Sequence, residues 1–300
     1  MASNRPALLY VALGLGVISF TFSPILVRWA SEAPGLAVAV WRTAFAVLLL
    51  APAAWWRIGP AVRSFSARDV LLITGAGILL GVHFIAWIES LYHTTVASAS
   101  VLVTTSPIFL VVLGFFVLNE RLSWTTVTAI VISVGGAVLI GVGDAQGIGV
   151  GPNPLWGNSL ALVASLFASL YLLIGRVVRQ QVDWLAYVFP LYTVAALTTL
   201  GTAWWQGIPL WGYDTGFYGL CLLMAIGPQL LGHGSFNYAL HYLPAALVGM
   251  LALLEPVGSS ALAVVLFGEV PNGLAIAGMG IVLIAVATVV WTERGRTPSD

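Results

Sequence analysis

The chain has 300 residues, of which 60% are hydrophobic and only 7% are charged, and its formal net charge is zero. A soluble domain of this length cannot bury so much apolar surface, so the composition predicts a protein whose main solvent is lipid. The balanced charge argues against a nucleic-acid partner, and the single cysteine, Cys221, excludes an internal disulfide. No Cys/His cluster has metal-ligand spacing, so we expect no metal site and no cofactor.

Ten apolar stretches are long enough to cross a bilayer, which takes about 20 residues per helix. Turn signals such as Gly59-Pro60 and Pro271-Asn272-Gly273 separate them. We expect the first stretch to be a retained helix, because no small-residue cleavage site follows it. In chain order the predicted spans cover residues 7–29, 36–56, 69–91, 95–118, 124–143, 155–177, 184–205, 215–239, 244–267 and 272–292.

The two halves of the chain are related by a shift of 149 residues without a gap. The superimposed landmarks are Trp55-Trp56 on Trp204-Trp205, Leu91 on Leu240, Pro107 on Pro256 and Glu120 on Glu269. Each half holds five spans, and because five is odd the second copy must cross the bilayer in the opposite sense. We predict an all-α membrane protein of two inverted units, residues 1–148 and 149–300, that form one integral domain. Inverted repeats are typical of transporters with a site at mid-membrane depth.

The arginines predict how the chain is oriented. All 11 basic residues are arginines, and nine of them fall on the side that holds both termini. Only Arg28 falls on the opposite side, and Arg42 lies within the second span. Positive residues collect on the cytoplasmic side of membrane proteins. We therefore expect both termini to be cytoplasmic, in the inner membrane of a bacterial cell.

A paired motif carries a family resemblance. Pro107 is followed thirteen residues later by Glu120, and Pro256 thirteen residues later by Glu269. Upstream stand the related runs 90–97 and 239–246. With the five-plus-five duplication, these runs resemble the duplicated EamA domain of the drug/metabolite transporter superfamily, over the whole chain. The aromatic-rich character is similar to the YddG-type exporters of aromatic amino acids.

The resemblance implies a basket of ten helices with a central cavity. The third, fourth, eighth and ninth spans would form its inner wall, and the first, second, sixth and seventh its moving flanks. The fifth and tenth spans would pack at the back. There Gly135-Gly136 and Gly278-Met279-Gly280 offer small-residue patches that let helices approach closely.

Polar residues inside a bilayer are costly and therefore point to function. Glu255 directly precedes Pro256, whose missing N–H frees a backbone carbonyl. It could bind a substrate ammonium or take up a proton; alternatively it is a protonated carboxyl bonded to a neighbouring helix. His83 and Trp87 share one helix face and suit an aromatic solute, or else His83 is a packed neutral histidine, and a role as proton carrier is a further option.

Two further features, and Tyr171 within the sixth span as a candidate aromatic residue, join the predicted cavity. Gln229, His233 and Asn237 recur every four residues and predict one polar stripe, lining the cavity or forming an interhelical ladder. Arg42, beside Trp41, matches an arginine common in EamA-type proteins. It could hold a substrate carboxylate, pair with Glu89, or cap carbonyls at a helix end. The predicted cavity residues are thus Trp41, Arg42, His83, Trp87, Tyr171, Gln229, His233, Asn237 and Glu255.

The remaining glutamates, tryptophan pairs and prolines have structural interpretations. We expect Glu120 and Glu269 to anchor helix ends, and the Trp pairs at 55–56 and 204–205 to lie in the aromatic belts of the two membrane interfaces. Prolines within spans are candidate hinges for alternating access, although each could be a static kink. These prolines are Pro24, Pro107, Pro190 and Pro256.

Together these patterns predict a secondary exporter of small, neutral, amphipathic metabolites, with aromatic amino acids as the leading substrates. Other amino acids, metabolites or drugs are the alternative. The phosphate-binding loop is absent, and it needs a lysine that this chain lacks, so ATP cannot drive transport directly. No catalytic residues are expected, since enzyme signatures and channel filter sequences are absent. The expected partners are a small-molecule substrate and the bilayer; oligomeric state is open, and a monomer is compatible with the sequence.

Overall fold

The computed structural model describes residues 6–94, 96–120, 122–145, 152–267 and 272–294, and in these residues all regular secondary structure is helical. The first half contains α1 (Ala7–Trp29), α2 (Gly35–Arg57), α3 (Gly59–Arg63), α4 (Ala67–His93), α5 (Val96–Val103), α6 (Ser106–Leu118) and α7 (Trp124–Ala145). The second contains α8 (Pro154–Val178), α9 (Trp184–Trp205), α10 (Thr215–Met224), the π-helix η1 (Ala225–His233), α11 (Gly234–Ala239), α12 (Ala245–Ala252), α13 (Leu254–Phe267) and α14 (Gly273–Arg294).

Eight helical segments of the described chain are long and apolar enough to cross a membrane. Two shorter apolar helices, Trp124–Ile140 and Gly273–Val289, lie within α7 and α14. Each predicted span therefore coincides with helical structure, and α7 and α14 each extend over 22 residues. The predicted separation of the second and third spans at Gly59-Pro60 is present, since α2 ends at Arg57 and α4 begins at Ala67, and a short helix, α3, begins there with Pro60 in its first turn.

Capping residues begin several of these helices where the apolar runs start. The Ser66 side chain accepts a hydrogen bond from the backbone N–H of Asp69, and Asp69 accepts one from the N–H of Ser66, which forms a capping box for α4. The side chains of Asn153 and Asp214 likewise accept a hydrogen bond from a backbone N–H in the first turn of α8 and of α10. Helix starts are therefore encoded locally, just outside the apolar stretches.

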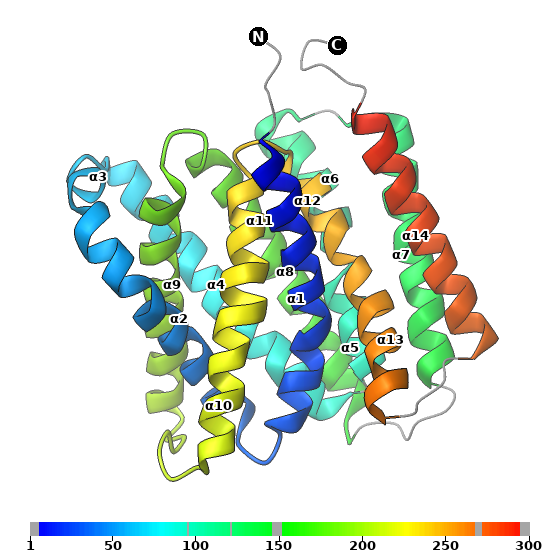
Figure 1. The fold of residues 1–300 in the computed structure, drawn as a ribbon, viewed down its shortest axis with the longest axis horizontal. Helices are drawn as coiled ribbons and strands as arrows, with labels where there is room; N and C mark the ends of the chain where they lie inside the picture. The colour runs from blue at the N-terminus through cyan, green and yellow to red at the C-terminus, as the bar shows by residue number, and fades with distance from the viewer. Residues whose placement is uncertain (1–5, 95, 121, 146–151, 268–271, 295–300) are drawn as a thin grey trace.

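The helices run roughly along one direction, and the start of α1 lies at the same end of the bundle as the end of α14 (Figure 1). Helix α4 packs along α8 and α9, while α1 packs along η1, α11 and α13. Helices α7 and α14 lie side by side at one edge of the molecule (Figure 1). Helices of the first half therefore pack directly against helices of the second half, and both halves form the centre of the bundle.

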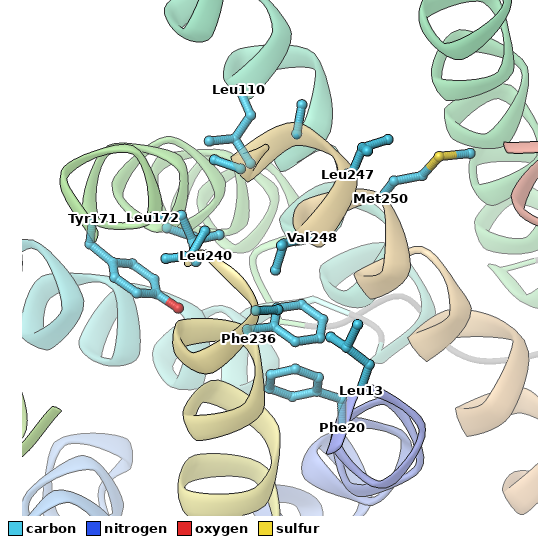
Figure 2. Close-up of a cluster of buried hydrophobic side chains, with 14 of the residues drawn as sticks. Leu13, Phe20, Leu110, Tyr171, Leu172, Phe236, Leu240, Leu247, Val248 and Met250 are labelled. Atoms are coloured by element: carbon cyan, nitrogen blue, oxygen red, sulfur yellow. The ribbon is translucent and has the colours of Figure 1, made fainter. Parts of the chain in front are cut away.

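Glycines set how closely some of these helices approach. A Cβ atom on Gly278 would lie 2.5 Å from the carbonyl oxygen of Gly136, across the contact between α14 and α7. The expected close approach of the two glycine patches is confirmed for Gly136 and Gly278. A Cβ atom added to Gly135 or Gly280 would have no neighbour within 4 Å. Beyond such contacts, the core is apolar. Figure 2 shows Phe20 of α1 and Phe236 of α11 side by side, with Leu110 of α6 and Val248 of α12 in the same cluster.

Candidate functional site

A cavity with a free volume of about 70 Å³ lies where the two halves meet. Its walls come from α1, α2, α4, α8, η1 and α11, and from the broken pairs α5/α6 and α12/α13. Pockets that hold drug-sized ligands measure about 300–1,000 Å³, so a bound metabolite requires these walls to move apart. The lining residues are Phe20, Ser23, Arg42, His83, Phe84, Trp87, Val103, Thr104, Ser106, Ala168, Tyr171, Leu172, His233, Phe236, Gly249, Ala252 and Glu255.

Two helix breaks bring irregular backbone to this cavity. The fourth span is interrupted at Thr104 and Thr105, and the ninth at Leu253, positions that are equivalent under the shift of 149 residues. In each case a proline follows within three residues, Pro107 or Pro256, and has no N–H for the carbonyl four residues earlier. Those carbonyls belong to Val103 and Ala252, and both residues line the cavity. Irregular backbone is tolerated at membrane depth where it faces such a cavity.

Of the nine predicted cavity residues, six lie in its wall. They come from five different helical segments, and each is at least nine-tenths buried. The six are Arg42, His83, Trp87, Tyr171, His233 and Glu255. The fold therefore places side chains that are far apart in the sequence around one small volume.

His233 is the centre of an aromatic group in the wall. Its ring centroid lies 4.9 Å from that of Phe20, 5.0 Å from that of Phe84 and 5.7 Å from that of His83. The Nδ1 atom of His233 and the hydroxyl of Tyr171 share a hydrogen bond of 2.7 Å. Edge-to-face ring contacts of this kind fix the orientation of the imidazole.

His83 has a defined proton position. Its Nδ1 atom lies 2.9 Å from the carbonyl oxygen of Ala164, which can only accept a hydrogen bond, so Nδ1 must carry the proton. In a neutral imidazole the other nitrogen, Nε2, is then an acceptor. A solute in the cavity would meet an acceptor at His83.

Arg42 is fully buried but has no carboxylate partner among the described residues. Its Nε atom donates to Oε1 of Gln229 at 3.1 Å, and its guanidinium carbon lies 4.2 Å above the ring of Phe84. The expected alternative partner, Glu89, instead lies 3.1 Å from Nε2 of His93. The geometry therefore orients the guanidinium by an amide and an aromatic ring and leaves its charge uncompensated.

Three buried polar atoms of the lining residues have no hydrogen-bond partner in the part of the chain that the structure describes. They are Nη1 of Arg42, Nε1 of Trp87 and Oε1 of Glu255. Native proteins satisfy nearly all buried polar groups, so unpartnered ones call for an explanation. Because all three border one cavity, a bound solute would supply the missing partners.

The other three predicted residues lie outside this wall. Trp41 is rotated about 100° from Arg42 on an α-helix, and its indole N–H donates to the carbonyl of Leu210 at 2.8 Å. The side-chain oxygen of Gln229 accepts a hydrogen bond from Arg42, and the side-chain amide of Asn237 donates to the carbonyl of His233 at 2.8 Å.

Of the predicted stripe of three polar residues, only His233 lines the cavity. Residues 225–233 form the π-helix η1, and an α-helix follows it. Pro228 within η1 is consistent with such a change, and π-helical segments often occur at functional sites.

The four predicted hinge prolines fall into two groups. Pro107 and Pro256 follow the helix breaks, whereas Pro24 and Pro190 lie inside the continuous helices α1 and α9. The paired tryptophans at 55–56 and 204–205 are all more than 80% exposed at helix ends, as interfacial anchors would be.

Sequence reasoning missed several wall residues. Phe20, Phe84 and Phe236 have polar neighbours in the sequence, but nothing local distinguishes a cavity-facing ring from a core ring. Ser106, which the shift of 149 residues superimposes on Glu255, also lines the cavity. No group of three or more possible metal ligands occurs among the described residues.

A second polar cluster lies where α6, α8 and α11 end. Nε of Arg176 donates to Oε1 of Glu120 at 3.0 Å, and its Nη1 donates to the carbonyl of Leu240 at 2.7 Å. Nearby, Nε of Arg179 donates to the carbonyl of Asn237 at 3.0 Å. The predicted anchor Glu120 thus joins three helix ends, while its counterpart Glu269 lies outside the described residues.

The comparisons with known proteins agree with this architecture. The EamA-like transporter family matches the chain twice, over residues 7–142 and 155–291. The pseudopaline exporter CntI of Pseudomonas aeruginosa (strain UCBPP-PA14) is 24% identical over 286 residues, which cover 92% of this chain and 94% of the relative. Solute carrier family 35 member G1 of Homo sapiens is 23% identical over 275 residues, which cover 88% of this chain and 73% of the relative.

A solved crystal structure superimposes with a TM-score of 0.77 over 97% of this chain and 100% of that structure, at 18% identity, which shows a shared fold. The predicted duplication of the EamA domain is confirmed by one family match in each half. The sequence and its relatives therefore show a multi-pass membrane transporter rather than an enzyme, and this chain belongs to the EamA-like transporter family.

Proposed function

We propose that this protein is a secondary transporter that exports small amphipathic metabolites, with aromatic amino acids as the leading substrates. The observation that carries the proposal is the buried cavity between the two halves, with a mainly apolar wall and unpartnered polar atoms. Such a site takes a solute by apolar contact and orients it through a few polar groups. Export, rather than import, is supported by the full-length relative named as a pseudopaline exporter.

The aromatic wall favours solutes with a flat apolar group. Phe20, Phe84 and Phe236 border the cavity together with the indole of Trp87. Aromatic rings prefer edge-to-face or offset contacts with other rings, which add to the free energy of simple area burial. Exporters of other amino acids, metabolites or drugs are the alternative within the same family.

We infer a ten-span inverted repeat as the framework of transport. The helix breaks at Thr104 and Leu253 are equivalent in the two halves. The packing is also exchanged between halves: the third span packs on the sixth, as α4 on α8, and the eighth packs on the first, as η1 and α11 on α1. A two-fold relation between inverted halves would produce this pattern, and it allows one half to rock against the other around the cavity.

The arginine distribution supports an inner-membrane protein with cytoplasmic termini. The start of α1 and the end of α14 share one end of the bundle, where α3 also lies (Figure 1). Arg57, Arg63 and Arg68 belong to or flank α3. Arginines at the end that holds the termini are those that the positive-inside rule assigns to the cytoplasm.

Counterflow in proteoliposomes tests the function. Vesicles with the purified protein are preloaded with unlabelled phenylalanine, tryptophan or threonine and given traces of labelled phenylalanine outside. A carrier accumulates label transiently, because internal substrate returns the binding site to the outer face; a channel only equilibrates it. We expect accumulation with phenylalanine or tryptophan inside and much less with threonine. Equal accumulation with all three would exclude aromatic selectivity, and none would exclude these substrates.

A further inference from the structure

The cavity contains one guanidinium and one carboxylate, and the two are not paired with each other. Arg42 and Glu255 are the only lining residues of the arginine, lysine, aspartate or glutamate type. Arg42 comes from α2 in the first half and Glu255 from α13 in the second. Nη1 of the first and Oε1 of the second have no hydrogen-bond partner among the described residues.

Arg42 and Trp87 present hydrogen-bond donors to the cavity. Nε of Arg42 is held by Gln229, and the guanidinium plane rests near Phe84, which leaves Nη1 free. The ring of Trp87 lies 5.9 Å from the guanidinium carbon, and its Nε1 is also unpartnered. Two neighbouring N–H donors, one of them charged, suit the two oxygens of a carboxylate.

Glu255 presents a carboxyl group to the cavity. It stands beside Pro256, and the residues whose carbonyls the two prolines cannot engage, Val103 and Ala252, also line the cavity. A carboxylate suits a protonated amine, which carries up to three donors and no acceptor. The two helix breaks thus bring residues of both halves to the wall that holds Glu255.

We propose that Arg42 with Trp87, and Glu255, form the two poles of a site for a metabolite that carries both a carboxylate and a protonated amine. A buried group is strongly unfavourable as an ion without a partner of opposite charge, and a solute with both charges supplies a partner to each pole. A solute with one charge leaves the other pole unpaired. The site therefore selects zwitterionic solutes over singly charged ones of the same size, an inference that rests on the proposed transport function.

The test uses three solutes that share one aromatic ring. Labelled phenylalanine counterflow is measured against unlabelled phenylalanine, phenylalaninamide, which lacks the carboxylate, and N-acetylphenylalanine, which lacks the charged amine. A lost hydrogen bond to a charged group is worth at least a factor of about ten in affinity. We therefore expect each analogue to compete at least about tenfold less well than phenylalanine.

Two variants then assign the poles. Arg42→Gln should bring phenylalaninamide within about threefold of phenylalanine, while Glu255→Gln should do the same for N-acetylphenylalanine. Each ratio is measured on one preparation, so it does not depend on the fraction of folded protein. Matched controls remove a charge outside the cavity: Arg57→Gln at the exposed end of α2, and Glu89→Gln on α4. Both controls should keep the wild-type ratios.

The outcomes separate this inference from the proposed function. Counterflow in which all three solutes compete equally would overturn the two-pole site and leave the transporter assignment standing. The same holds if the variants change both ratios alike. Absence of counterflow with phenylalanine, tryptophan and threonine would overturn the proposed substrates and the site with them.

Discussion

Replacing Gly77 by alanine should separate α4 from α9 and destabilise the protein. A Cβ atom at Gly77 would lie 2.8 Å from the carbonyl oxygen of Leu191 and 2.6 Å from Cβ of Val194, whereas ordinary contacts begin at 3.4 Å. The helices would therefore have to move apart by roughly 0.6–0.8 Å at this crossing. Overpacking of a tight interface typically costs about 1–3 kcal/mol.

Gly75→Ala is the matched control, because Gly75 lies on the same helix and nothing lies within 4 Å of its added Cβ. Both substitutions replace glycine by alanine within α4, so the change in intrinsic helix propensity is common to the two. Thermal unfolding in detergent, followed by tryptophan fluorescence, should show Gly77→Ala as less stable than Gly75→Ala by about 1–3 kcal/mol. Equal stability of the two variants would refute the close packing of α4 on α9.

Three other tests address the site, the polar cluster and the topology. His83→Ala and Glu255→Gln should each lower counterflow at least about tenfold while expression stays close to wild type, because each removes a cavity group; unchanged transport in both would discard the cavity assignment. Arg176→Gln and Glu120→Gln should each lower thermal stability, by up to about 1 kcal/mol for this partly exposed pair, and a double-mutant cycle should show coupling between them. Additive losses would mean that the ion pair contributes nothing. A reporter fused to the C-terminus should be active in the cytoplasm, as the nine-to-one arginine count requires; activity only in the periplasm would overturn the orientation.

The sequence located the membrane-embedded segments well, because hydropathy and turn chemistry are local properties. The predicted span 184–205 coincides with α9, and the predicted 155–177 differs from α8 by one residue at each end. Duplication was equally visible, since a constant shift needs no structural information. Local signals were less informative where the helices are irregular: Pro107 and Pro256 indicated kinks but not that the breaks would fall at Thr104 and Leu253.

Side-chain direction was only partly predictable. His83 and Trp87, four residues apart on a regular α-helix, both face the cavity as the helical period suggests. The same argument put Gln229 and Asn237 in the wall, whereas Gln229 accepts a hydrogen bond from Arg42 and Asn237 donates one to the carbonyl of His233. Trp41 was grouped with its neighbour Arg42, although adjacent residues on a helix point in different directions.

The chain by itself thus determined that this is a duplicated membrane transporter of the EamA-like family, since apolar run length, repeat spacing and motif pairs are written along the sequence. Only the tertiary structure decided which polar groups meet. Arg42 and Glu255 are 213 positions apart in the sequence, yet both border one cavity, and neither forms an ion pair within the part of the chain that the structure describes. Whether a buried charge is paired depends on helix crossings and close glycine contacts between distant segments, and no local pattern encodes those distances.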